Sequence, residues 1–229
     1  MFQLNSKLSF HRIVALTTGI SLLIMAVAAF FAINLPGEEL NLGTKEEIHS
    51  VASQLRGNLL AWLIILITDV LVAWGLYVLL EERNRHISLL AAWFRLLYTC
   101  ILGVGISYLL STALPLLLET PSDLLAEPDH LGEMIGMASR GFQEVWSFGL
   151  IVFGIHLLLL GGVVLQTRIP RFLGILLLLA GLGYCIVHTG GLLSAGFDTY
   201  KKTIEMIFML PMIAGEIGLA IWLLIKGGK

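Results

Sequence analysis

Hydrophobic residues fall into six long runs along the chain, and short polar segments separate the runs. A helix of about 20 residues, rising 1.5 Å per residue, crosses the hydrocarbon core of a bilayer, which is about 30 Å thick. We therefore predict an all-α fold, a six-transmembrane-helix bundle made of three helical hairpins, as a single membrane domain over 1–229. The predicted spans cover residues 13–33, 59–80, 87–110, 145–165, 172–192 and 204–225.

The two longer polar segments, before the second and fourth spans, carry helix signals of their own. Thr44 and Glu47 have the spacing of a capping box, and Asp129 is placed to cap a second helix. Apolar residues then recur at helical intervals, so we predict short amphipathic helices in the first two outer loops. They would lie on the membrane interface or close over a central cavity as a lid. Their apolar positions are Ile48, Val51, Ala52 and Leu55, then Leu131, Met134, Ile135 and Ala138.

A short similarity links these two regions. Residues 56–62 and 140–146 both begin with an Arg-Gly pair and end on a tryptophan, Trp62 or Trp146. Duplicated hairpins would produce this pattern, as in transporters with parallel repeats, and chance would also produce it. We interpret both tryptophans as anchors at the membrane interface.

Composition excludes several classes of protein. The chain of 229 residues is 57% hydrophobic and 13% charged, about half the charged fraction of a soluble domain. A net charge of −2 without a long basic run argues against a nucleic-acid partner. Cys100 and Cys185 lie in apolar runs without the spacing of metal ligands, so we expect reduced thiols, no metal and no cofactor.

Charged loop residues predict the orientation in the membrane, because cytoplasmic loops are enriched in lysine and arginine. One set of span ends carries most of the basic residues, and we place it, with both termini, on the cytoplasmic side of a bacterial cytoplasmic (inner) membrane. The basic set is Lys7, Arg12, Arg83, Arg85, Arg168, Arg171, Lys226 and Lys229. The opposite side is acidic, with Glu38, Glu39, Glu46, Glu47, Glu119, Asp123, Glu127, Asp129, Glu133 and Asp198.

Four ionisable residues lie deep inside four different predicted spans: Asp69, Arg95, His156 and Glu216. Counted from the cytoplasmic ends, three of them lie about 16 Å deep, and the long side chain of Arg95 reaches the same level. A charged group at that depth costs a few kcal/mol, so such groups face a partner or a cavity. We expect Arg95 to pair with Asp69 or with Glu216.

One cation beside two carboxylates leaves a surplus negative charge. A proton on a carboxyl group, a protonated His156 or a bound cation would balance it. This combination predicts a central polar pocket that binds a small molecule or protons, for transport or sensing. The alternative is a structural or partner-binding subunit whose buried ion pairs only fix helix packing. Besides the lipid bilayer the sequence names no partner, and it is compatible with a homo-oligomer.

An intramembrane hydrolase is the third hypothesis, and it has less support. Zinc hydrolases need several ligands and an open coordination position, and His156 is the one deep histidine. Ser107 has no histidine at its level on a neighbouring span, and a serine in mid-helix usually bonds to its own backbone. We therefore predict no catalytic residues.

Several short motifs resemble a bacterial membrane family, domain of unknown function 4386. They are Asp69 with Leu76-Tyr77, the segment LAAWFR at 90–95, RIPRFLG at 168–174, and Glu216 ahead of WLLIKG at 222–227. The resemblance covers spans two to six and, more loosely, the first. It implies a six-helix integral membrane protein of no established activity.

Overall fold

The computed structural model of the chain describes residues 2–35, 44–118 and 128–228. Every regular element in these residues is helical: α1 (Phe2–Ala32), α2 (Lys45–Leu118), α4 (Pro128–Val164), α5 (Arg171–Leu193), the 3-10 turn η1 (Ala195–Phe197) and α6 (Asp198–Lys226). The predicted all-α class is thus confirmed. Five of the outer-side acidic residues lie outside the described residues: Glu38, Glu39, Glu119, Asp123 and Glu127.

Five helices in the described residues are long and apolar enough to cross a membrane. Even α5, with 23 residues, reaches about 35 Å at 1.5 Å per residue. Large apolar side chains are exposed along these helices, and soluble monomers rarely expose contiguous apolar patches of this extent. Those on α5 and α6 include Phe172, Ile175, Leu179, Leu182, Ile186, Met206, Ile207, Met209, Leu210, Ile213, Ile221 and Ile225. The helices therefore indicate a membrane protein.

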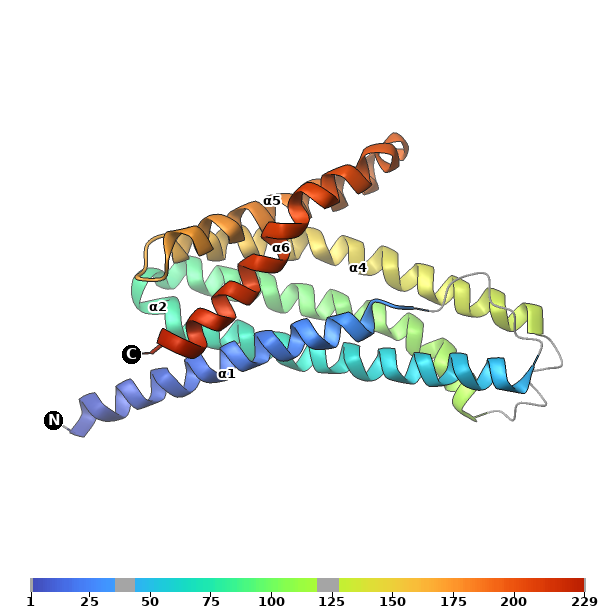
Figure 1. The fold of residues 1–229 in the computed structure, drawn as a ribbon, viewed down its shortest axis with the longest axis horizontal. Coiled ribbons are helices and arrows are strands. Elements are labelled where there is room, and N and C mark those ends of the chain that lie inside the picture. Colours follow the sequence, from blue (N-terminus) through green and yellow to red (C-terminus); the bar gives the residue numbers. More distant parts are fainter. Residues whose placement is uncertain (1, 36–43, 119–127, 229) are drawn as a thin grey trace. The chain divides into compact units, whose positions relative to one another are not determined.

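The second and third predicted spans lie in one long element, α2, which breaks at Asn84. The backbone of Asn84 is not helical (φ −154°, ψ 89°). Its side-chain oxygen accepts a hydrogen bond from the backbone N–H of Ile87 at 3.2 Å, as an N-cap does for a new helix. α2 thus consists of two helical limbs, and the chain reverses direction between them (Figure 1).

The chain divides into two compact units. Unit 1 consists of Met1–Ala26, Ile67–Thr99 and Ser147–Lys229, and unit 2 of Val27–Leu66 and Cys100–Trp146. Within unit 1, α5 and α6 run side by side (Figure 1). The single-domain description of the chain stays a prediction.

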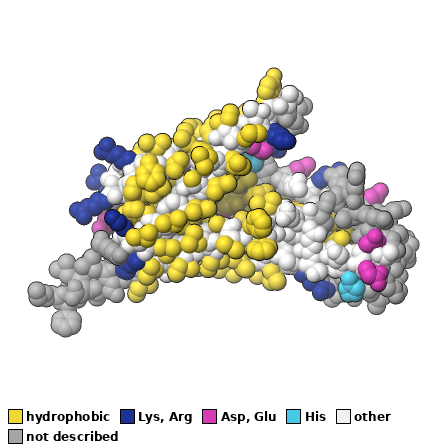
Figure 2. All heavy atoms as spheres, viewed as in Figure 1, with side chains coloured by type: hydrophobic (Ala, Val, Ile, Leu, Met, Phe, Trp, Pro, Cys, Tyr) yellow, Lys and Arg dark blue, Asp and Glu magenta, His cyan; other side chains and the backbone are white. Residues whose placement is uncertain are grey.

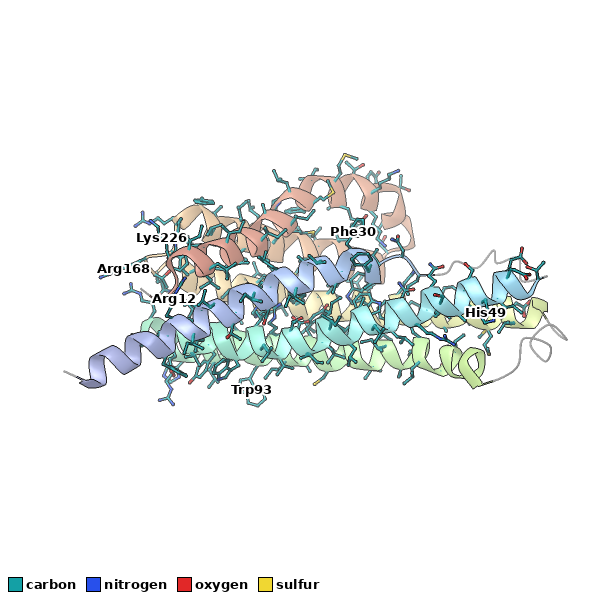
Figure 3. The ribbon with its side chains drawn as sticks, turned by 60° about the horizontal axis from the view of Figure 1, so that its bottom comes forward. Arg12, Phe30, His49, Trp93, Arg168 and Lys226 are labelled. Carbon is teal, nitrogen blue, oxygen red and sulfur yellow. The ribbon has the colours of Figure 1, made fainter. Side chains whose placement is uncertain are left out.

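One end of unit 1 is basic. Arg12, Arg168 and Lys226 gather at this end (Figure 3). Figure 2 shows lysine and arginine side chains at the same end, beside a broad hydrophobic surface. Arg12 donates to the carbonyls of Leu223 and Gly227 at 3.1 and 2.8 Å, where a cation complements the negative end of the α6 dipole. One member of the predicted basic set, Arg12, therefore caps the C-terminal end of α6.

In unit 2, the two predicted loop helices are not separate elements. Both are continuous with long helices: α2 begins at Lys45, and α4 begins at Pro128, which puts Asp129 inside its first turn. The predicted capping box is confirmed, since the Glu47 N–H donates to Thr44 Oγ1 at 3.2 Å and the Thr44 N–H donates to Glu47 Oε2 at 2.9 Å.

The apolar stripes of these two regions pack against each other. Ile48 and Leu55 of α2 share a buried cluster with Leu131 and Ile135 of α4. Because each stripe covers the other, the interpretation of both as helices on the membrane interface is wrong, and the lid interpretation stays a prediction. The anchor interpretation is also wrong for Trp62, whose buried ring lies 4.8 Å from the Phe142 ring and 5.2 Å from the Trp146 ring, between centroids.

Candidate functional site

The candidate site lies in unit 1, where the two limbs of α2 bring Asp69 and Arg95 together. Both side chains are buried. Arg95 donates from Nε to Oδ1 of Asp69 at 2.8 Å, and its Nη2 lies 2.7 Å from the same oxygen. The reversal at Asn84 makes this pair possible, because it sets residues of the two limbs at the same level.

Arg95 also reaches two further helices. Its Nη1 donates to Glu216 Oε1 of α6 at 3.1 Å and lies 3.2 Å from His156 Nε2 of α4. The structure thus brings together all four ionisable residues predicted from the sequence, and Arg95 pairs with both carboxylates rather than with one. Their role as a binding site or proton relay stays a prediction.

Two neighbours of Arg95 complete its surroundings. Nη2 donates to the sulfur of Met25 in α1 at 3.4 Å, and the guanidinium carbon lies 5.2 Å from the centre of the Phe153 ring in α4. Each of the three guanidinium nitrogens therefore contacts at least one acceptor in the described residues. Sequence analysis missed Met25 and Phe153, because neither residue stands out in an apolar run.

The hydrogen bonds of His156 define its protonation. Nε2 faces an arginine N–H, which is always a donor, so Nε2 must be the acceptor. Nδ1 lies 2.8 Å from the carbonyl oxygen of Ala91, which can only accept, so Nδ1 carries the hydrogen. This geometry requires a neutral imidazole, because a proton on Nε2 would point at the guanidinium.

Exposure separates Glu216 from the other three residues. Asp69, Arg95 and His156 are 0–1% exposed, whereas the Glu216 side chain is 18% exposed. With His156 neutral, the cluster holds one fixed positive charge and two carboxyl groups. If both groups were ionised the cluster would carry one surplus negative charge, and Glu216 is the member that solvent, lipid or a partner can reach.

Space beside the cluster is small. A cavity of about 10 Å³ borders His156 and Ala91 and is also lined by Ser88 and Tyr77, a volume that holds about one water molecule. No group of three or more His, Cys, Asp or Glu side chains in the described residues is placed to hold a metal ion. In the four-residue cluster, the Arg95 guanidinium occupies the centre.

A serine–histidine contact, which the sequence did not reveal, lies elsewhere in unit 1. Ser147 Oγ of α4 is 2.8 Å from His188 Nδ1 of α5, and the Tyr184 ring stacks on the His188 ring at 6.1 Å between centroids. A serine nucleophile needs a histidine that is itself oriented by a third group, usually a carboxylate. No carboxylate of the described residues forms an ion pair with His188, so the contact lacks that part of the arrangement.

A comparison of the chain with models of known protein families identifies the family to which it belongs. The model of the family described as domain of unknown function (DUF4386) matches residues 17–227. The chain belongs to this family. The match covers all four residues of the cluster and confirms the resemblance stated from the sequence motifs.

A relative comes from Archaeoglobus fulgidus, where it is described as an uncharacterized protein. It is 34% identical over 167 residues, which cover 72% of this chain and 81% of the relative. Similar chains are therefore not confined to bacteria, and the bacterial source stays a prediction. No solved structure matches the chain.

Proposed function

We propose that the chain is a six-span integral membrane protein in which Glu216 takes up and releases a proton beside the permanently charged Arg95. The two limbs of α2 on either side of Asn84, with α1, α4, α5 and α6, support six spans in three hairpins. The basic end of unit 1 supports a cytoplasmic membrane location with both termini in the cytoplasm.

The observation that carries this proposal is the partial exposure of Glu216 in contact with a buried arginine. A carboxylate at membrane depth is stable only with a counter-charge, a proton or water. Arg95 is shared with Asp69, which already faces two of its nitrogens. A proton on Glu216 would remove the surplus charge. Loss of that proton would leave a Glu216 carboxylate that accepts one hydrogen bond, from Arg95 at 3.1 Å.

Proton binding receives more support than small-molecule binding at this cluster. Each nitrogen of the Arg95 guanidinium already contacts an acceptor in the described residues, so a ligand would have to compete with these contacts. His156 is held as a neutral donor to Ala91. The switchable group is therefore Glu216 rather than His156.

The second candidate function is structural or partner-binding. The contacts of Arg95 favour it, because one guanidinium joins α1, both limbs of α2, α4 and α6. A buried cluster of this kind can specify packing without any ligand. In that case the charge on Glu216 would not change during function.

Proton flux into liposomes containing the purified protein tests the transport form of the proposal. Hydrogen–deuterium exchange in α6 at two pH values tests the sensing form, since loss of the Glu216 proton should alter how α6 is held. Glu216→Gln should abolish the wild-type response in whichever assay shows one. Glu205→Gln is the matched control, because Glu205 is an exposed carboxylate on the same helix.

Two results would decide against proton handling. The first is a wild-type protein without pH response in either assay. The second is a response that Glu216→Gln and Glu205→Gln change equally. Either one would favour the structural function, in which Glu216→Gln lowers thermal stability and alters nothing else.

A further inference from the structure

A second cavity lies at the basic end of unit 1, apart from the Arg95 cluster. Its volume is about 120 Å³. An apolar cavity of about 150 Å³ in another protein holds a benzene molecule, so this one has room for a short hydrocarbon segment. Its walls come from the first limb of α2, the end of α4 and the last turns of α6, and include Leu76, Leu79, Leu80, Val164, Leu219 and Trp222.

The rim of this cavity carries a cation. Arg168 lines the cavity and is exposed, and it forms no ion pair with the described residues. Arg12 and Lys226 lie at the same end of the unit (Figure 3). No acidic residue of the described part of the chain lines the cavity.

We infer that this cavity binds one anionic amphiphile, with its headgroup on Arg168 and a segment of its hydrocarbon chain between α2 and α6. An apolar cavity with a single cation at its rim matches a ligand that is charged at one end and apolar along the rest. Basic pockets between transmembrane helices on the cytoplasmic side bind the headgroups of anionic lipids. The predicted orientation places this end of the unit among such headgroups.

Other ligand classes match the cavity less well. A free anion would make no apolar contact with the leucine walls. A neutral lipid would bring no negative charge to Arg168. Phosphatidylglycerol and a fatty acid share the required chemistry, so the experiment must distinguish them. The inference is independent of the proton proposal, because Arg168 and Glu216 are separate groups and Glu216 does not line the cavity.

Native mass spectrometry of the detergent-purified full chain can count retained lipid directly. Wild-type protein is titrated with phosphatidylglycerol, phosphatidylcholine, oleate or inorganic phosphate. We expect one tightly bound phosphatidylglycerol, about fivefold weaker binding in Arg168→Gln for the loss of one interfacial charge, and little binding of phosphatidylcholine or phosphate. Oleate binding as tight as that of phosphatidylglycerol would identify a fatty acid as the ligand.

Matched variants distinguish lipid binding in the cavity from general electrostatic attraction of lipid to the basic surface. Arg171→Gln removes an exposed charge three residues away that does not line the cavity, and it should bind phosphatidylglycerol as the wild type does. Leu79→Trp fills the cavity and should weaken binding without removing a charge. Thermal unfolding establishes that each variant is folded.

Three outcomes would overturn the inference. The first is equal loss of binding in Arg168→Gln and Arg171→Gln, which indicates surface charge alone. The second is unchanged binding in a folded Leu79→Trp variant. The third is inorganic phosphate that competes as well as phosphatidylglycerol, which indicates an anion site without a role for the hydrocarbon chain.

Discussion

Two nitrogens of Arg95 face the same oxygen of Asp69, at 2.8 and 2.7 Å, and the second oxygen of Asp69, Oδ2, has no partner among the described residues. Both side chains are buried. A buried polar atom without a hydrogen bond costs free energy, so the pair is not fully satisfied. The remaining Arg95 donors are directed to Glu216, His156 and Met25 instead.

Replacing Arg95 with lysine should destabilise the fold, although the charge is kept. A lysine ammonium has three donors on one nitrogen, and it cannot reproduce the planar arrangement of five. Removing one partner of a buried pair costs about 3–5 kcal/mol, and we expect a loss toward that range in the free energy of unfolding, measured in detergent. Arg85→Lys, at an exposed position, should change stability little. An Arg95→Lys protein as stable as the wild type would contradict the importance of these contacts.

Replacing Asp69 with asparagine should remove the pH response of the cluster. Without the Asp69 charge, Arg95 and an ionised Glu216 balance each other, so Glu216 has no surplus charge to relieve. Hydrogen–deuterium exchange in α6 should then depend on pH much less than in the wild type. Glu82→Gln, which removes a carboxylate outside the cluster, is the control, and a pH response retained in folded Asp69→Asn would argue against the charge balance described above.

Gly75 allows α1 to approach α2 closely. A Cβ atom added at Gly75 would overlap the hydroxyl of Thr18, a buried side chain bonded to the carbonyl of Val14 at 2.8 Å. Overpacking of this kind costs about 1–3 kcal/mol, so Gly75→Ala should lower the free energy of unfolding by that amount. The double variant Gly75→Ala/Thr18→Ala should recover part of the loss.

Gly162 supplies the control for this prediction. An added Cβ there meets no heavy atom within 4 Å, and alanine is the better helix former. Gly162→Ala should therefore be neutral or slightly stabilising. Equal losses in Gly75→Ala and Gly162→Ala would show that the Thr18 contact does not limit packing.

In unit 2, Leu55→Ala tests whether the two apolar stripes form a packed core. Leu55 is buried in a cluster with Leu131 and Ile135, and truncation of a buried leucine costs about 2–5 kcal/mol. Leu60→Ala removes the same atoms from an exposed site of the same helix and should cost much less. Similar small losses at both positions would support helices that lie on the membrane interface instead.

Hydrophobic pattern was sufficient to predict the helices, because runs of the length needed to cross a bilayer are unambiguous. It did not predict that α2 and α4 continue through the outer segments, since a capping box at Thr44 marks where a helix begins and says nothing of where it ends. The contact between the stripes around Leu55 and Ile135 is a tertiary feature. Two amphipathic helices facing each other have the same sequence pattern as two that face a membrane.

The members of the Arg95 cluster were predictable for a related reason. Ionisable residues are so costly inside a span that four at one depth indicate a shared location. Exposure and donor geometry were not predictable, because they depend on how the helices rotate about their axes. The sequence left a carboxyl proton, a protonated His156 and a bound cation as alternatives, and the contacts of His156 with Arg95 and Ala91 match a neutral ring.

Infrared difference spectroscopy of the reconstituted protein between two pH values tests the central claim most directly, because a protonated carboxyl group has its own C=O absorption. The account predicts a pH-dependent carboxylic acid band in the wild type and in Glu205→Gln that is absent from Glu216→Gln. A band that persists in folded Glu216→Gln, or a wild-type spectrum without one, would contradict proton exchange at Glu216.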